Sequence, residues 1–238
     1  RERYPGGGVA AVLARFGHRR VWERRPGDAD FGAVTVGTAE QPSALQPPGQ
    51  HDAVRLWHAP LLADLVDEGP LAVIGPSHRA RAVARALLTD LCFGHAPGDV
   101  RVWVIAPDGS DDWEFARWLP HAFTDDHAHP GGAQVATGHG TRAALVDALR
   151  AAIADRRERG VDAGAPRHGR PVLPLHVVVV DGAATLPTAD LAALLHDGPP
   201  VGVTAIVLDE SVVPDGARAE LRLGIHADDA TYASLRTA

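Results

Sequence analysis

A run of four consecutive valines, Val177–Val180, is the feature that most constrains the fold of this 238-residue chain. Leu175 precedes the run, and Asp181-Gly182 ends it. A strand that is apolar at successive positions is buried on both faces, and such strands are typical of parallel sheets that carry helices on both sides. We therefore expect an α/β domain in which Leu175–Val180 is a central strand.

From Pro70 onward, short apolar runs alternate with helical patterns, as in a parallel sheet with crossover helices. The predicted strands are Leu71–Ile74, Val100–Ile105, Leu175–Val180, Val203–Leu208 and Glu220–Ile225, with Thr231–Leu235 as a candidate edge strand. Four helices are predicted. The first ends near Gly94, the second covers Asp111–Leu119, the third runs from Thr141 to Gly160 and the fourth covers Thr188–Leu195. The expected class is an α/β fold like that of P-loop NTPases, with a mainly parallel sheet and helices on both faces.

The first sixty residues have a different texture. Glycine and proline breakers occur at Gly6–Gly8, at Pro26-Gly27 and at Pro47–Gly49, and between them lie short extended candidates at Arg20–Trp22 and Ala33–Val36. We predict a small β-rich N-terminal appendage or linker over residues 1–60, followed by the α/β domain over residues 61–238.

A degenerate phosphate-binding loop follows the strand Leu71–Ile74. The segment GPSHRARA lies where a loop of the form G-x-x-x-x-G-K-[ST] would lie. Gly75 matches the first glycine, but Ala80, Arg81 and Ala82 replace the second glycine, the lysine and the hydroxyl residue. Arginine is a wide planar fork and does not replace a compact ammonium conservatively, and the chain contains no lysine that could take its place. We therefore predict that the loop has lost the features that grip a triphosphate.

Two interpretations of this segment remain open. A plain turn from strand to helix explains it, but a helix N-terminus with nearby cations also suits weak anion binding, such as weak binding of ATP and magnesium. The candidate contacts for the anion are Gly75, Ser77, His78, Arg79 and Arg81.

Asp181 follows the valine run, where a P-loop NTPase keeps the carboxylate that positions Mg²⁺. We note it as a candidate magnesium position, although aspartate is also common there for capping and turn formation. The next position usually carries the acid that activates water, and here it is Gly182. We therefore predict no catalytic residue and no obligatory cofactor.

The sequence gives little support for a metal site or for a catalytic nucleophile. The densest group of metal-ligand types is His121, Asp125, Asp126, His127 and His129, whose spacing is irregular, and we predict a solvated loop without a metal. The single cysteine, Cys92, lies in an apolar helical pattern and is expected to be a buried side chain. No nucleophile elbow or zinc-protease motif occurs.

Net charge and hydropathy argue against a nucleic-acid-binding protein and against a membrane-spanning segment within this chain. The formal net charge is −7, which disfavours a large non-specific grip on nucleic acid. The longest apolar run, Leu173–Val180, is far shorter than the roughly 20 residues that span a bilayer. Because the chain begins with Arg1 and contains no methionine, we expect a segment of a longer polypeptide.

Several of these stretches together resemble the EccC family, the FtsK/SpoIIIE-type motor proteins of actinobacterial type VII (ESX) secretion systems. The similarity rests on WERRPGDADF at Trp22–Phe31, Val36-Gly37-Thr38, the Gly75-Pro76 turn, DWEFARWLPH at Asp112–His121 and the VVVVDG strand. It runs in order from about residue 20 to about residue 226. The matched region is the membrane-proximal domain that precedes the three recognised ATPase modules.

The resemblance implies an ATPase-like domain without a competent phosphate loop, on the cytoplasmic side of the plasma membrane and joined to the membrane by helices that flank this segment. Its implied role is to couple the motor modules to the membrane complex during protein export. The implied partners are other subunits of that complex and the downstream ATPase modules of the same chain, with no nucleic acid. An atypical domain that binds or hydrolyses ATP, or a DNA translocase with a basic channel, are the alternatives.

Overall fold

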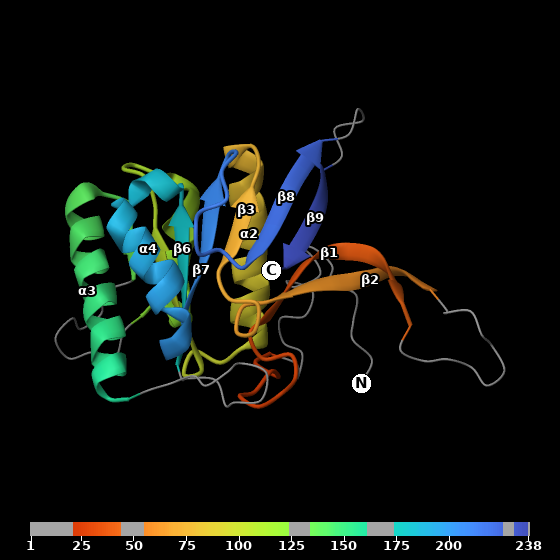
Figure 1. Cartoon of the computed structure of the whole chain (residues 1–238), viewed down its shortest axis with the longest axis horizontal. Coiled ribbons are helices and arrows are strands. Elements are labelled where there is room, and N and C mark those ends of the chain that lie inside the picture. The colour runs from red at the N-terminus through yellow and green to blue at the C-terminus, as the bar shows by residue number, and fades with distance from the viewer. Residues whose placement is uncertain (1–20, 44–54, 124–133, 161–173, 226–230, 238) are drawn as a thin grey trace.

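The computed structural model describes residues 21–43, 55–123, 134–160, 174–225 and 231–237 (Figure 1). Its main feature is a seven-stranded sheet with the order β5-β4-β6-β7-β3-β8-β9. The strands are β3 (Leu71–Ile74), β4 (Val100–Ile105), β5 (Val135–Ala136), β6 (Leu175–Asp181), β7 (Val203–Asp209), β8 (Ala219–Ile225) and β9 (Thr231–Thr237). All neighbours are parallel except β8 and β9, which confirms the predicted α/β class.

The central strand β6 divides the core into two clusters. Val177 and Val179 pack in one cluster with residues of α2 (Ser77–Gly94). Val178 and Val180 pack in the other with residues of α3 (His139–Glu158) and α4 (Thr188–Asp197). All four valines are fully buried. The apolar run in the sequence therefore reflects burial on both sides of the sheet, as predicted.

The described residues also form four short 3₁₀ helices. They are η1 (Asp111–Trp118), η2 (Pro120–Ala122), η3 (Ala183–Thr185) and η4 (Pro199–Val201). The helix predicted after Ser110 is therefore present as a 3₁₀ helix. Within the described part of the chain, no helix combines the length and the apolar character needed to cross a membrane.

The N-terminal region forms an antiparallel hairpin that projects from the body of the molecule (Figure 1). It consists of β1 (Ala33–Pro42) and β2 (Arg55–Asp64). This agrees with a small β-rich appendage, although β2 was not predicted. Because β2 runs across residue 60, the division into domains at that residue stays a prediction.

The prediction of an extended segment at Arg20–Trp22 is wrong for the two residues that the structure describes, because Val21 and Trp22 form a turn. Trp22 has a φ of 58°, a conformation that bulky residues rarely adopt. The backbone N–H of Trp22 donates to the carbonyl oxygen of Phe93 at 2.9 Å, and the N–H of Arg24 donates to that of Gly94 at 3.0 Å. The chain therefore turns here to attach to the C-terminal end of α2.

A buried histidine completes this attachment. The Nε2 atom of His95 accepts a hydrogen bond from the N–H of Gly32 at 2.9 Å. Its Nδ1 atom lies 2.8 Å from the carbonyl oxygen of Leu91 and therefore carries the proton. His95 is fully buried, and this burial lowers its pKa to about 4. A neutral ring thus joins the appendage to α2.

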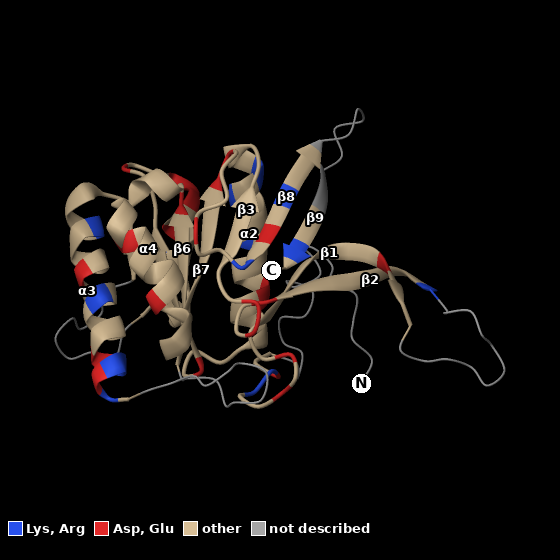
Figure 2. Ribbon diagram, in the orientation of Figure 1, with Lys and Arg blue, Asp and Glu red and all other residues tan. Residues whose placement is uncertain are grey.

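Charged residues of both signs are interspersed on the surface of α3 (Figure 2). Arg150 pairs with Asp147 at 2.8 Å, and Arg157 pairs with Asp197 of α4 at 2.7 Å. Such exposed pairs contribute little to stability. Their alternation leaves no basic face on this helix.

Candidate functional site

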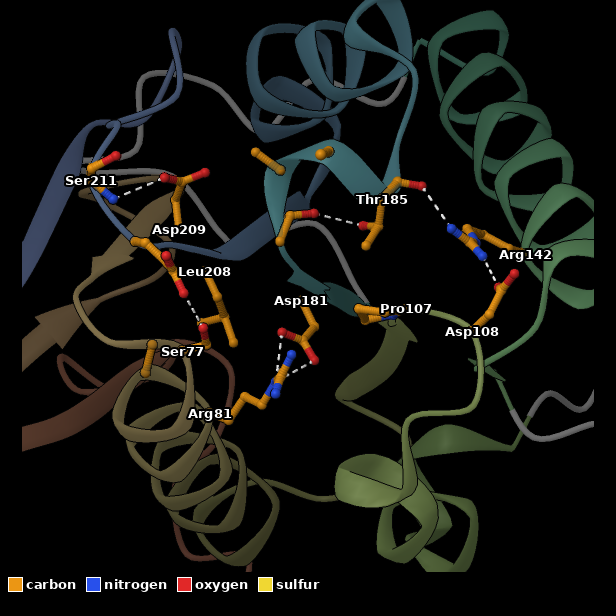
Figure 3. Close-up of a pocket in the computed structure, with 15 residues that line it drawn as sticks. Ser77, Arg81, Pro107, Asp108, Arg142, Asp181, Thr185, Leu208, Asp209 and Ser211 are labelled. Carbon is orange, nitrogen blue, oxygen red and sulfur yellow. Dashed lines mark hydrogen bonds and ion pairs between the residues drawn. The ribbon is translucent and has the colours of Figure 1, made fainter.

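An open pocket of about 640 Å³ lies at the carboxyl ends of β3, β4, β6 and β7 (Figure 3). In open α/β sheets this edge is where ligands bind. Its charged lining consists of Arg81, Asp108, Arg142, Asp181, Asp209 and Glu210. The pocket therefore carries four carboxylates against two guanidinium groups.

The segment that resembles a phosphate loop is folded as a helix. Helix α2 begins at Ser77, and only Gly75 and Pro76 separate it from the last residue of β3. The N–H groups of Arg79 and Ala80 donate to the carbonyl oxygen of Pro76 at 2.8 and 3.0 Å. These amides therefore satisfy the first helical turn and do not surround an anion.

Gly75 has a packing role. Its φ is 155°, and a Cβ atom there would lie 2.8 Å from the Cβ of Leu223 on β8. Its N–H donates to the carbonyl oxygen of Asp209 at 3.0 Å. The conformation and the close approach both favour glycine, so this residue is explained without a phosphate.

Arg81 and Asp181 form the centre of the pocket. The Nε atom of Arg81 donates to both carboxylate oxygens of Asp181, at 3.0 and 2.9 Å (Figure 3). The indole Nε1 of Trp113, on η1, donates to Oδ2 of Asp181 at 2.9 Å. Asp181 is only 3% exposed. Its carboxylate therefore accepts three hydrogen bonds from two neighbouring side chains.

This arrangement does not fit a magnesium ion. In P-loop NTPases the carboxylate at this position helps to hold Mg²⁺, whereas here both oxygens of Asp181 face a guanidinium. A metal ion would have to displace Arg81, and the following residue, Gly182, supplies no carboxylate. The residues present therefore do not form a magnesium site.

The second arginine of the pocket is also paired. Arg142, from the first turn of α3, forms an ion pair with Asp108 and lies 3.4 Å from the carbonyl oxygen of Thr185. At the rim, Asp112 lies 2.7 Å from Arg85 and 3.5 Å from Arg81. The two pocket arginines are thus engaged by carboxylates of the same chain.

The structure brings together only some of the predicted site residues. Ser77, Arg81 and Asp181 line the pocket, whereas Gly75, His78 and Arg79 do not belong to its lining. The sequence reasoning missed Trp113, Asp108, Arg142 and Glu210. Trp113 belongs to the DWEFARWLPH string, but nothing in that string indicates a bond to a residue 68 positions away.

The predicted solvated histidine and aspartate loop is described only in part. His121 is buried, and its Nε2 lies 2.8 Å from the carbonyl oxygen of His95. The other four residues, Asp125, Asp126, His127 and His129, lie outside the described residues. Cys92 is buried, and burial raises the pKa of its thiol.

Two of the solved structures with a similar fold come from type VII secretion ATPases. The cytoplasmic domain of the Thermomonospora curvata type VII secretion ATPase EccC aligns with a TM-score of 0.54 at 16% identity, over 92% of this chain and 26% of that one. EssC (ATPases 2 and 3) from Geobacillus thermodenitrificans aligns with a TM-score of 0.54 at 14% identity, over 85% and 39%. The fold is therefore that of the ATPase domains of type VII secretion motors.

Sequence comparison identifies the family. No protein-family profile matches the chain. The ESX secretion system protein EccC of Thermomonospora curvata is 31% identical over 229 residues, which cover 87% of this chain and 16% of the relative. The ESX-4 secretion system protein EccC4 of Mycobacterium tuberculosis is 29% identical over 204 residues, which cover 68% and 16%. The chain belongs to the EccC family of ESX secretion proteins and spans about a sixth of the length of these relatives.

Proposed function

We propose that this chain is an ATPase-like domain that does not turn over ATP and that couples the ATPase modules of a type VII secretion motor to its membrane complex. In this proposal it lies on the cytoplasmic side of the plasma membrane, next to the membrane. Its partners are the other subunits of that complex and the ATPase modules of the same polypeptide. The observation that carries the proposal is the Arg81–Asp181 pair, in which the guanidinium of Arg81 binds both carboxylate oxygens that would otherwise be available to a magnesium ion.

The energetics of this pair oppose its replacement by magnesium and nucleotide. Asp181 is 3% exposed, so moving Arg81 away leaves a buried carboxylate without its cation. Loss of one partner of such a pair costs about 3–5 kcal/mol. A nucleotide would have to supply this free energy in addition to opening the first turn of α2. Hydrolysis would also need a base, and the position after Asp181 is Gly182.

Measurements of ATP binding at equilibrium and of ATP hydrolysis test whether the chain lacks catalytic activity. We expect a labelled ATP analogue with Mg²⁺ to bind the purified chain no more tightly than millimolar, and we expect no steady release of phosphate from ATP. The alternative function is an atypical ATP-binding or ATP-hydrolysing domain, which the size of the pocket favours. Phosphate release that stops in an Arg81→Ala variant would establish this alternative.

The coupling role requires a test in secreting cells. A double variant, Arg81→Gln with Asp181→Asn, removes both charges and keeps groups that can hydrogen bond. We expect export to continue at a normal rate because no turnover depends on these residues. Loss of export by a double variant that unfolds at the normal temperature would contradict the proposal.

Exposed aromatic residues provide the complementary test of coupling. The side chains of Trp57 and Trp118 are 74% and 84% exposed. Exposed tryptophans are enriched among residues that dominate protein interfaces. We expect Trp57→Ala or Trp118→Ala to reduce co-purification with the membrane complex while the chain stays folded. Normal recovery of the complex with both variants would count against coupling through these surfaces.

Nucleic acid is not proposed as a partner. The net charge of −7 and the paired charges on α3 argue against a basic channel. A gel-shift experiment at low salt, where electrostatic binding is strongest, would reveal a DNA translocase. We expect no shift.

A further inference from the structure

The N-terminus of α2 faces a carboxylate from another part of the chain. The first turn of this helix contains no acidic residue, and its cap, Pro76, makes no side-chain hydrogen bond. The hydroxyl of Ser77 donates a hydrogen bond to Oε1 of Glu210, the residue that follows β7. A negative charge near a helix N-terminus is stabilised by the helix dipole and the N-terminal amides. Glu210 therefore binds the first residue of α2, at the end of the helix that stabilises a negative charge.

The backbone holds Glu210 at this place. Asp209 pairs with Ile74 in the register of β7 and β3, and its carbonyl oxygen accepts the N–H of Gly75 at 3.0 Å. The side chain of Asp209 accepts the N–H groups of Ser211 and Val212 at 3.0 and 2.9 Å. The chain is thus fixed immediately before and after Glu210, beside the start of α2.

We propose that Glu210 is a built-in anion that occupies the former phosphate position and makes the pocket reject polyphosphates. With Arg81 paired to Asp181 and Arg142 to Asp108, the carboxylate of Glu210 adds to the excess negative charge of the lining. An incoming phosphate must displace this carboxylate from Ser77 or remain beside it as a like charge. This inference rests on the proposed function, because it gives a physical reason why a pocket of this size would bind a nucleotide only weakly.

The variant Glu210→Gln tests this proposal. Glutamine keeps the length of the side chain and can still accept from Ser77, but it carries no charge. The experiment is calorimetric titration of the purified chain with inorganic phosphate in metal-free buffer. We expect the variant to bind phosphate about tenfold more tightly than the unaltered chain, which is the effect of removing one like charge at a few ångströms from partly solvated surroundings. Because Glu210 is exposed, the variant should fold normally, and Glu210→Ala provides a second variant.

The matched control is Asp215→Asn. It changes the net charge by the same amount at a fully exposed side chain that does not line the pocket. We expect its phosphate affinity to stay within twofold of that of the unaltered chain. Equal affinities in the Glu210 and Asp215 variants, or no phosphate binding by either Glu210 variant, would overturn the proposal. ATP hydrolysis by the unaltered chain would instead contradict the proposed function, so the two failures can be distinguished.

Discussion

The two ends of α2 are held by opposite kinds of polar chemistry. At its N-terminal end, Arg81 and Ser77 bind the carboxylates of Asp181 and Glu210. At its C-terminal end, the neutral ring of His95 accepts the N–H of Gly32 and donates to Leu91. The first end lies in an open pocket and depends on charge, whereas the second is buried and depends on the absence of charge. One helix therefore separates the pocket from the attachment of the appendage, and the two can be perturbed independently.

The largest expected effect is at the pocket end. Arg81→Ala leaves the buried carboxylate of Asp181 with only Trp113 as a described side-chain donor. We expect the free energy of unfolding to fall by about 3–5 kcal/mol, measured by urea denaturation monitored by circular dichroism. The control, Arg81→Gln with Asp181→Asn, should be less destabilised than the single variant. A single variant as stable as the unaltered chain would show that the pair contributes only as an exposed salt bridge does.

Low pH should destabilise the chain at the C-terminal end of α2, where His95 is buried. Burial lowers the pKa of His95 to about 4, whereas a histidine in the unfolded chain has a pKa near 6.5. Between these values the unfolded state binds more protons, so stability is fully present above about pH 6.5 and falls as the pH falls toward 4. For His95 alone the loss is roughly 3 kcal/mol. Burial also lowers the pKa of His121 and of His176, which adds loss in the same direction.

Measuring the free energy of unfolding at pH values from 7.5 to 4 checks this prediction. His95→Gln is the matched variant, because its amide can accept the N–H of Gly32 but does not take up a proton. We expect this variant to be less stable at neutral pH and to lose less stability on acidification. Parallel pH profiles for the two proteins would assign the acid sensitivity to other groups.

The smallest expected effect is at the rim of the pocket. Asp112 is 41% exposed and pairs with Arg85 at 2.7 Å. Exposed pairs of this kind contribute about 0–1 kcal/mol, so Asp112→Asn should lower the free energy of unfolding by less than about 1 kcal/mol. Comparing the thermal denaturation of this variant with that of Arg81→Ala would show how much more the Arg81–Asp181 pair contributes to stability than the exposed pair at Asp112. A larger effect at Asp112 would mean that the whole network acts as a unit.

The strands and helices of the α/β domain were predictable because burial imposes a period on the sequence. The run Leu175–Val180 predicted β6 almost to the residue, since both of its faces lie in the core. β2 was missed because Pro60 interrupts its pattern and its first four residues are exposed. Proline is tolerated there because β2 is an edge strand of a two-stranded sheet. β5 was missed because it has only two residues.

For the candidate site, the sequence identified positions but not contacts. Arg81 and Asp181 were recognised separately, each by its place after a strand. Their bond joins residues 100 positions apart, and the order of the strands that brings them together is not encoded in either local pattern. Glu210 and Arg142 carried no signal because their roles depend on which strand ends lie next to each other.

The early start of α2 limits what substitutions could do to give this pocket a nucleotide-binding loop. Replacing Ala80, Arg81 and Ala82 by glycine, lysine and threonine would recreate the letters of a nucleotide-binding signature. The main-chain N–H groups at positions 79 and 80 donate to Pro76 within the helix, and Gly75 is packed against Leu223. These three substitutions alone would therefore leave the main chain without the loop that such a signature needs, and the backbone before α2 would have to change as well.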